Sequence, residues 1–308
     1  MVDLRKTPLN LLPTSTNRLN CQEPVTPRIA ALTILTLVAF ASNSILCRLA
    51  LADGSIDAAS FTLIRLMSGA VMLSLIALLR HKRVQLDGGG SWISGALLFG
   101  YAAAFSFAYL NLSAGTGGLI LFASVQFTMI GWGIAKGERP NWMEWLGLAV
   151  AFAGLLMLVA PGLNAPSPAG AVLMLIAGVS WGCYSLRGRG ASDPALATTE
   201  NFIKAVPFAC VPLAFGMSQL HELPKGVLLA IVSGAVTSGL GYVLWYSVLP
   251  SLTATRAAIA QLAVPAIVAI GGVLLLSEHV DLRFAIASAM MLGGVALALA
   301  TRVKPKGS

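Results

Sequence analysis

Long apolar stretches alternate with short polar connections along almost the whole chain. Ten of these stretches come close to or exceed the roughly 20 residues that a helix needs to cross the hydrocarbon core of a membrane. They cover residues 29–49, 58–79, 91–111, 114–135, 141–160, 168–187, 197–216, 225–249, 253–276 and 281–301. The pattern predicts an all-α integral membrane protein with ten transmembrane helices, and the short connections predict that consecutive helices are antiparallel neighbours.

The second half of the chain repeats the first at a distance of about 140 residues. An odd number of membrane helices in each half would insert the second copy upside down relative to the first, and transporters use this arrangement to place a site between two halves. The expected organisation is a cytoplasmic disordered tail (1–28), repeat one with five helices (29–162), repeat two with five helices (163–302) and a short cytoplasmic tail (303–308). The matching positions are Arg65 with Lys204, Tyr101 with Tyr242, Glu138 with Glu278, and Gly154 with Gly294.

Composition supports a lipid environment. Hydrophobic residues make up 57% of the chain and charged residues only 10%, whereas soluble domains carry about 25% charged residues. The four cysteines show no paired or metal-like spacing, so neither a metal nor another cofactor is expected. No nucleophile, zinc motif or acid–base pair is recognisable, which argues against an enzyme.

The basic residues predict the orientation of the chain. With the N-terminus in the cytoplasm, fifteen lysines and arginines fall on the cytoplasmic side and three on the opposite side, as the positive-inside rule requires. Both termini are therefore expected in the cytoplasm. The net charge of +8 is then a topology signal that favours anionic lipid headgroups, and no nucleic-acid partner is expected.

Two charged residues, Arg65 and Lys204, lie inside predicted membrane helices at equivalent depths from opposite faces. A charge at this depth is costly unless it meets a partner, a cavity or the interface. Each could attract an anionic group such as a substrate carboxylate, or could support the bundle by snorkelling or by binding backbone carbonyls. The acidic residues lie in tails, loops or helix ends, with Glu144 and Glu200 about a turn inside, so no proton relay is expected.

Several uncharged polar and aromatic residues also lie within the predicted helices. The amides are Asn43, Gln126 and Gln261, and the aromatic residues away from the membrane interfaces are Tyr101, Trp181, Tyr184, Tyr242 and Trp245. They could pack the bundle or line a central cavity that orients a ligand. Pro265 is expected to kink the ninth helix and to act in gating, because its counterpart in repeat one is Val125 and the kink would be asymmetric.

These features resemble the EamA branch of the drug/metabolite transporter superfamily over residues 30–301. The resemblance is carried by Arg65, by the Trp181-Gly182 pair, by the segment from Pro265 to Glu278, by Gly137-Glu138 and by the glycines from Gly147 to Gly154. Repeat one departs from the family pattern at Phe40-Ala41, where Trp-Gly is common.

The resemblance implies a bacterial inner-membrane exporter of amino acids or similar small metabolites that works by alternating access. It also implies a central cavity lined by the first, third, fourth, sixth, eighth and ninth helices. On this chain that cavity would be lined by Asn43, Tyr101, Gln126, Trp181, Tyr184, Tyr242, Trp245 and Gln261.

Other functions remain open on the sequence alone. A carrier of drug-like, nucleotide-sugar or lipid-linked molecules would use Arg65 and Lys204 to attract phosphate. A membrane scaffold or an embedded enzyme is the alternative from another class. Without a buried acid, downhill facilitation is favoured over proton antiport. The sequence does not distinguish a monomer from a homodimer.

Overall fold

A computed structural model describes residues 26–81, 89–137, 139–161, 165–188, 191, 193–214, 223–252 and 260–301. The predicted C-terminal tail, almost all of the N-terminal tail, and Glu138 lie outside these residues. All the regular secondary structure in the described residues is helical. In chain order the helices are α1 (Pro27–Ala52), α2 (Ala58–His81), α3 (Trp92–Ala108), α4 (Ala114–Ala135), α5 (Trp142–Val159), α6 (Pro168–Gly188), α7 (Pro194–Ala214), α8 (Pro224–Ile231), η1 (Val232–Leu240), α9 (Gly241–Val248), η2 (Leu249–Ser251), α11 (Ala263–Leu276) and α12 (Leu282–Thr301).

The described helices have the length and surface of a multi-pass membrane protein. Seven of them, counting α8, η1 and α9 as one rod, are long and apolar enough to cross a membrane, and α3 and α11 are apolar but shorter. Large apolar side chains such as Val71, Leu79 and Leu274 are 67–75% exposed. Water would penalise such exposure, whereas the hydrocarbon core of a bilayer does not. The prediction of an all-α membrane protein is therefore confirmed for the described residues.

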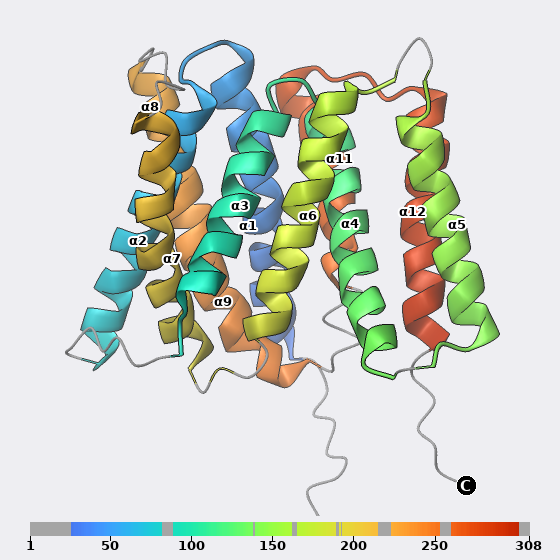
Figure 1. Ribbon diagram of the computed structural model, residues 1–308, viewed down its shortest axis with the longest axis horizontal. Coiled ribbons are helices and arrows are strands. Elements are labelled where there is room, and N and C mark those ends of the chain that lie inside the picture. Colours follow the sequence, from blue (N-terminus) through green and yellow to red (C-terminus); the bar gives the residue numbers. More distant parts are fainter. Residues whose placement is uncertain are drawn as a thin grey trace, which may run out of the picture.

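The helices stand side by side in one bundle (Figure 1). The N-terminal end of α1 and the C-terminal end of α12 lie on the same side, at the bottom of the view. The strongest packing pairs are α5 with α12, α3 with α6, α4 with α6, α2 with α7, and α2 with η1. The α5–α12 pair stands at one end of the bundle, and α2, α7 and α8 lie at the other (Figure 1).

The predicted eighth helix is interrupted by a π-helical segment. Residues 225–249 were expected to form one helix, but η1 (Val232–Leu240) is a π-helix between α8 and α9. A Cβ atom on Gly234 would overlap the carbonyl oxygen of Arg65 and Oγ of Ser68, so this glycine lets η1 touch the backbone of α2. Such π-segments are rare and occur frequently at functional sites.

The ninth predicted helix contains a break near its proline. The chain makes a turn at Leu262, and α11 begins at Ala263, so Pro265 lies in the first turn of α11. A proline is tolerated there because the first helical N–H groups have no partner within the helix. Residues 260–261 before this turn are helical, and Leu262 keeps right-handed helical dihedrals (φ −65°, ψ −19°). The helix is therefore interrupted three residues before Pro265, close to where the sequence predicted a kink.

Candidate functional site

Among the described residues, the buried basic side chain is that of Arg65 on α2. Its side chain is 3% exposed, and its Nη2 atom donates a hydrogen bond of 3.1 Å to the hydroxyl of Tyr101 on α3. The guanidinium carbon lies 5.3 Å from the ring centre of Tyr101 and 5.0 Å from that of Phe105. Both contacts are within the range of cation–π attraction. Nη1 is buried and has no hydrogen-bond partner in the part of the chain that the structure describes.

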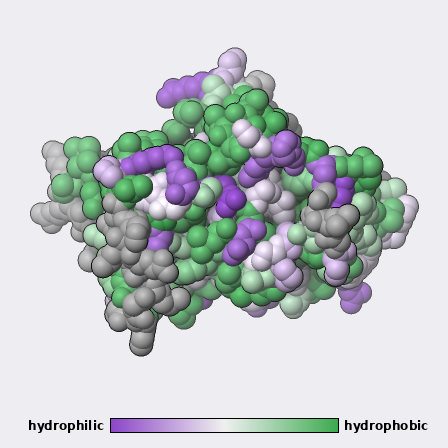
Figure 2. Space-filling model, turned by 90° about the horizontal axis from the view of Figure 1, so that it is seen from above, coloured by the Kyte–Doolittle hydropathy of each residue, from purple (hydrophilic) through white to green (hydrophobic). Residues whose placement is uncertain are grey.

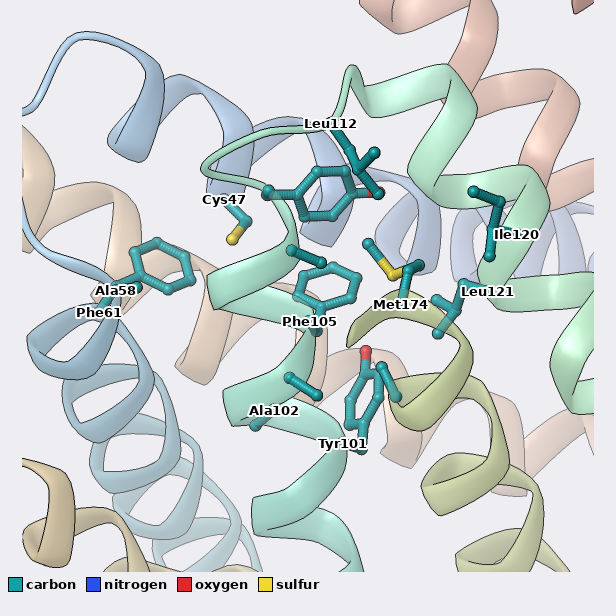
Figure 3. Close-up of a cluster of buried hydrophobic side chains, with 14 of the residues drawn as sticks. Cys47, Ala58, Phe61, Tyr101, Ala102, Phe105, Leu112, Ile120, Leu121 and Met174 are labelled. Atoms are coloured by element: carbon teal, nitrogen blue, oxygen red, sulfur yellow. The ribbon is translucent and has the colours of Figure 1, made fainter. Parts of the chain in front are cut away.

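The two rings beside Arg65 come from one face of α3. Tyr101 and Phe105 are one turn apart, and their ring centres are 5.4 Å apart. Figure 3 shows them on this face, with Cys47 of α1 on one side and Met174 of α6 on the other. The spacing of four residues places the two side chains one above the other along the helix.

The rings of α3 continue into α6 and α9. Trp181 lies 4.9 Å from Tyr101, 5.3 Å from Tyr184 and 5.5 Å from Tyr242 between ring centres. Four of the sequence-predicted site residues are therefore in one group. We call Tyr101, Phe105, Trp181, Tyr184 and Tyr242 the central aromatic cluster. Its members come from both halves of the chain.

Trp245 lies next to this cluster and Asn43 forms a separate polar group. Phe40 joins Trp245 to the cluster, because its ring centre is 5.6 Å from that of Tyr242 and 6.0 Å from that of Trp245. Asn43 Oδ1 accepts hydrogen bonds from three hydroxyls of η1: those of Ser233 (2.9 Å), Thr237 (2.6 Å) and Ser238 (3.3 Å). The amide thus ties α1 to the π-helical segment.

The two glutamines lie on other elements. Gln126 is buried on α4, and Gln261 is half-buried immediately before the turn at Leu262. Neither has a ring contact or a hydrogen bond that joins it to the central aromatic cluster among the contacts of the described residues. Their participation in a substrate site stays a prediction.

Lys204 differs sharply from Arg65 although the two are equivalent in the repeat. Its Nζ atom lies 3.1 Å from Oε2 of Glu200, one turn earlier on α7, and donates a 2.7 Å hydrogen bond to the carbonyl of Gly90. Its side chain is 22% exposed. These contacts correspond to the structural alternative, in which the charge supports the bundle.

The structure also contains a cavity of about 270 Å³ away from the central aromatic cluster. It lies beside the start of α4, the C-terminal half of α11 and the start of α12, and Ser113, Thr116, Glu278 and Arg283 are among its lining residues. Glu278 accepts backbone hydrogen bonds from Ala114 (2.6 Å) and Gly115 (3.2 Å) at the start of α4. Figure 2 views the face at the top of Figure 1 and shows hydrophilic patches among apolar side chains there.

Sequence reasoning missed two members of the site. Phe105 and Phe40 did not enter the predicted set, although the four-residue spacing from Tyr101 to Phe105 indicated a shared helix face. For Phe40 the signal was its place at the Phe40-Ala41 pair, which is the repeat-one counterpart of Trp181-Gly182. The packing of α1 against α9 brings it to Tyr242.

A bundle of membrane helices that buries an arginine and several tyrosines is typical of a transporter, because polar groups inside the membrane usually line a substrate pathway. The model of the EamA-like transporter family matches the chain twice, over residues 28–160 and 168–300. The chain therefore belongs to the EamA-like transporter family of the drug/metabolite transporter superfamily. The two matches are equal in length and begin 140 residues apart, which agrees with the predicted repeat.

Individual relatives agree with this assignment. The chain is 48% identical to an uncharacterized protein of Pseudomonas aeruginosa over 90% of this chain and 96% of that one. It is 29% identical to a probable amino-acid metabolite efflux pump of Escherichia coli over 64% of this chain and 74% of that one. A solved crystal structure that is 20% identical superposes with a TM-score of 0.62 over 88% of this chain and 98% of that one, which supports the fold.

Proposed function

We propose that this transporter exports amino acids or similar small metabolites across the bacterial inner membrane by alternating access. The observation that carries the proposal is the central aromatic cluster, in which side chains of α3 meet side chains of α6 and α9 beside the buried charge of Arg65. A site between two halves is where a carrier with internal repeats binds its substrate. The Escherichia coli relative, a probable amino-acid metabolite efflux pump, also supports the amino-acid class.

The packing of the helices supports two inverted halves. If α1 to α5 are matched with α6 to α12 in order, α5 pairs with its own counterpart α12, and α2 with its own counterpart α7. In this matching, the counterpart of α3 is the rod of α8, η1 and α9, and the counterpart of α6 is α1. The α3–α6 pair therefore predicts a pairing of α1 with η1 and α9, and this pairing is present. The α4–α6 pair becomes α11 with α1, which is present as well. A two-fold relation between the halves accounts for all of these pairs.

Polar contacts close both ends of the bundle and are suited to gating. At the lower end in Figure 1, Asn201 of α7 accepts a 3.0 Å hydrogen bond from the backbone N–H of Ser91, and Lys204 binds the carbonyl of Gly90. At the upper end, Arg48 donates a 2.7 Å hydrogen bond to the carbonyl of Tyr109, and Glu278 binds the start of α4. Alternating access would open one set of contacts while the other stays closed. Placing both termini in the cytoplasm makes the lower end the inner gate.

Transport by purified protein in liposomes tests the proposal. Liposomes loaded with a mixture of labelled amino acids should lose at least one of them faster when the protein is present, and an imposed pH gradient should leave the rate unchanged if facilitation is downhill. Tyr101→Ala should reduce this flux at least tenfold. Trp142→Ala removes a side chain that is 68% exposed and serves as the control, with unchanged flux. Absence of flux for every amino acid, or equal flux in Tyr101→Ala and wild type, would contradict the proposal.

A further inference from the structure

The unpartnered nitrogen of Arg65 gives the proposed transport site a chemical preference. Nη1 is a charged hydrogen-bond donor, is enclosed by protein, and has no partner in the described parts of the chain. Burying such a donor without an acceptor is unfavourable. The neighbouring rings of Tyr101 and Phe105 attract the cation through their faces, but a ring face does not supply the in-plane oxygen that a guanidinium N–H prefers. An anionic oxygen is the acceptor that best completes this environment.

The titratable groups that interact with Arg65 are themselves uncharged in their ordinary forms. They are the phenols of Tyr101 and Tyr242 and the thiol of Cys47. Among the described residues, the buried carboxylates are Glu144 and Glu200. Glu200 pairs with Lys204, and Glu144 accepts a hydrogen bond of 3.3 Å from the side chain of Asn141 in the first turn of α5. Among the described residues, the titratable groups that act on Arg65 at the central aromatic cluster thus include no carboxylic acid.

The hydroxyl of Tyr101 extends the donor set. Its oxygen accepts the hydrogen bond from Nη2 of Arg65, and a phenol that accepts one hydrogen bond still has its own hydrogen to donate. Nη1 and this hydroxyl can therefore bind the two oxygens of one carboxylate. The remaining walls are the rings of Phe105, Trp181 and Tyr242, which favour an apolar body on the same ligand.

We infer that this site selects its substrate through a carboxylate that binds Arg65, and that an α-amino group adds little to recognition. The inference rests on the proposed transport function and specifies the substrate class: monocarboxylates with an apolar or aromatic body, whether or not they carry an amine. Because Arg65 is 3% exposed, the carboxylate reaches Nη1 only when the helices on one side of the bundle separate.

Three ligands with the same benzyl body separate the contributions of the two charged groups. Phenylalanine carries both the carboxylate and the amine, phenylpyruvate has no amine, and phenethylamine has no carboxylate. Their affinities are measured on detergent-purified protein from the ligand-dependent rise of the unfolding temperature. We expect the two acids to bind within about threefold of each other and phenethylamine to bind at least tenfold more weakly.

Variants at position 65 test the role of the guanidinium. Arg65→Gln should weaken both acids at least tenfold without changing the affinity for phenethylamine, and Arg65→Lys should retain part of the binding because it keeps the charge. Arg139→Gln removes an exposed positive charge and is the control. Should Arg65→Gln fail to fold, the comparison of the three ligands on the wild-type protein still decides the inference.

The inference and the proposed function fail in different ways. Equal binding of phenethylamine and phenylalanine, no binding of either acid at millimolar concentration, or unchanged acid binding in a folded Arg65→Gln variant would overturn the carboxylate selection. Flux of amino acids in liposomes could persist in each of these cases. Conversely, carboxylate binding without any amino-acid flux would overturn the proposed export and leave the binding preference intact.

Discussion

Gly147 of α5 and Gly294 of α12 touch each other through their backbones. A Cβ atom on Gly147 would lie 2.5 Å from the carbonyl oxygen of Gly294, and a Cβ atom on Gly294 would lie 2.5 Å from the carbonyl oxygen of Gly147. Gly154 makes a similar approach to the carbonyl of Ala287 at 3.0 Å. The repeat relates these two contacts. Its offset of 140 residues takes Gly147 to Ala287 and Gly294 to Gly154, so the Gly147–Gly294 contact becomes the Gly154–Ala287 contact. Small residues let the helices approach closely where lipid supplies no hydrophobic driving force.

Gly147→Ala and Gly294→Ala should therefore destabilise the protein. The added methyl group meets backbone atoms that cannot rotate away, and overpacking of this kind costs about 1–3 kcal/mol. Gly293→Ala is the matched control because a Cβ atom there has nothing within 4 Å, and alanine is the better helix former. Unfolding temperatures in detergent should fall for the first two variants and stay level or rise for the third. Equal temperatures for Gly293→Ala and Gly294→Ala would contradict the close contact.

Glu278 should stabilise the start of α4 from a distance in sequence. Its two oxygens accept the backbone hydrogen bonds of Ala114 and Gly115, which have no acceptor inside the helix. A carboxylate at this position also interacts favourably with the helix dipole. We expect Glu278→Ala to lower the free energy of unfolding by about 1–2 kcal/mol and Glu278→Gln to lower it less, by analogy with the loss of a helix cap.

His279 provides the control for Glu278. His279 follows Glu278 directly in the connection between α11 and α12, and it is exposed. His279→Ala should therefore leave the denaturation midpoint nearly unchanged. Denaturation followed by circular dichroism in the same detergent measures all three variants. A midpoint for Glu278→Ala that matches His279→Ala would show that the carboxylate does not cap α4.

The polar group around Asn43 should hold α1 against the π-helical segment. Asn43→Ala removes the acceptor shared by the hydroxyls of Ser233, Thr237 and Ser238. Interhelical hydrogen bonds in membrane proteins contribute about 0.6 kcal/mol on average, so we expect a loss of about 1 kcal/mol or more for three partners. Thr237→Val removes one donor and should cost less. If Thr237→Val proved less stable than Asn43→Ala in the same unfolding measurement, Asn43 would not be the acceptor shared by the three hydroxyls.

The sequence predicted an all-helical membrane protein correctly, because length and apolar character decide which segments enter a membrane. The interruption at η1 was not predictable from hydropathy. The segment contains the contact of Gly234 with the backbone of Arg65, and such a tertiary contact exists only after α2 and the eighth helix have packed. The break before Pro265 was anticipated as a kink, since a proline disturbs the preceding turn wherever the helix begins.

The different surroundings of Arg65 and Lys204 were partly visible in the sequence. Lys204 has Glu200 four residues earlier, a spacing that places the two charges on the same helix face. The residue four positions before Arg65 is Phe61, so no acid on α2 is available at the same spacing. Sequence equivalence indicated matching depth in the membrane, whereas the tertiary packing decides that Arg65 meets aromatic rings and Lys204 meets the carbonyl of Gly90.

A pH-dependent contribution should come from the ion pair between Asp53, after α1, and Lys225, at the start of α8. The hydrogen bonds from the Lys225 ammonium and the Ser55 hydroxyl hold the pKa of the Asp53 carboxyl below its ordinary value. A carboxyl whose pKa is lower in the folded protein stabilises it above the unfolded pKa of about 4. This stabilisation is lost as the pH falls through the folded pKa.

The two side chains are 44% and 60% exposed, so solvent screening limits the contribution to about 0.5 kcal/mol. Lys225→Met should therefore be slightly less stable than the wild type at pH 7 in low salt. The difference should begin to shrink as the pH falls below about 4 and should vanish below the lowered pKa of Asp53 in the folded protein. In an Asp53→Asn background, Lys225→Met should have no effect at either pH. Chemical denaturation at both pH values measures the difference. Repeating it in about 0.5 M salt, which shortens the Debye length to about 4 Å, should reduce the difference at pH 7 by screening the pair. A difference that persists at the lower pH would mean that Lys225 stabilises α8 through contacts other than Asp53.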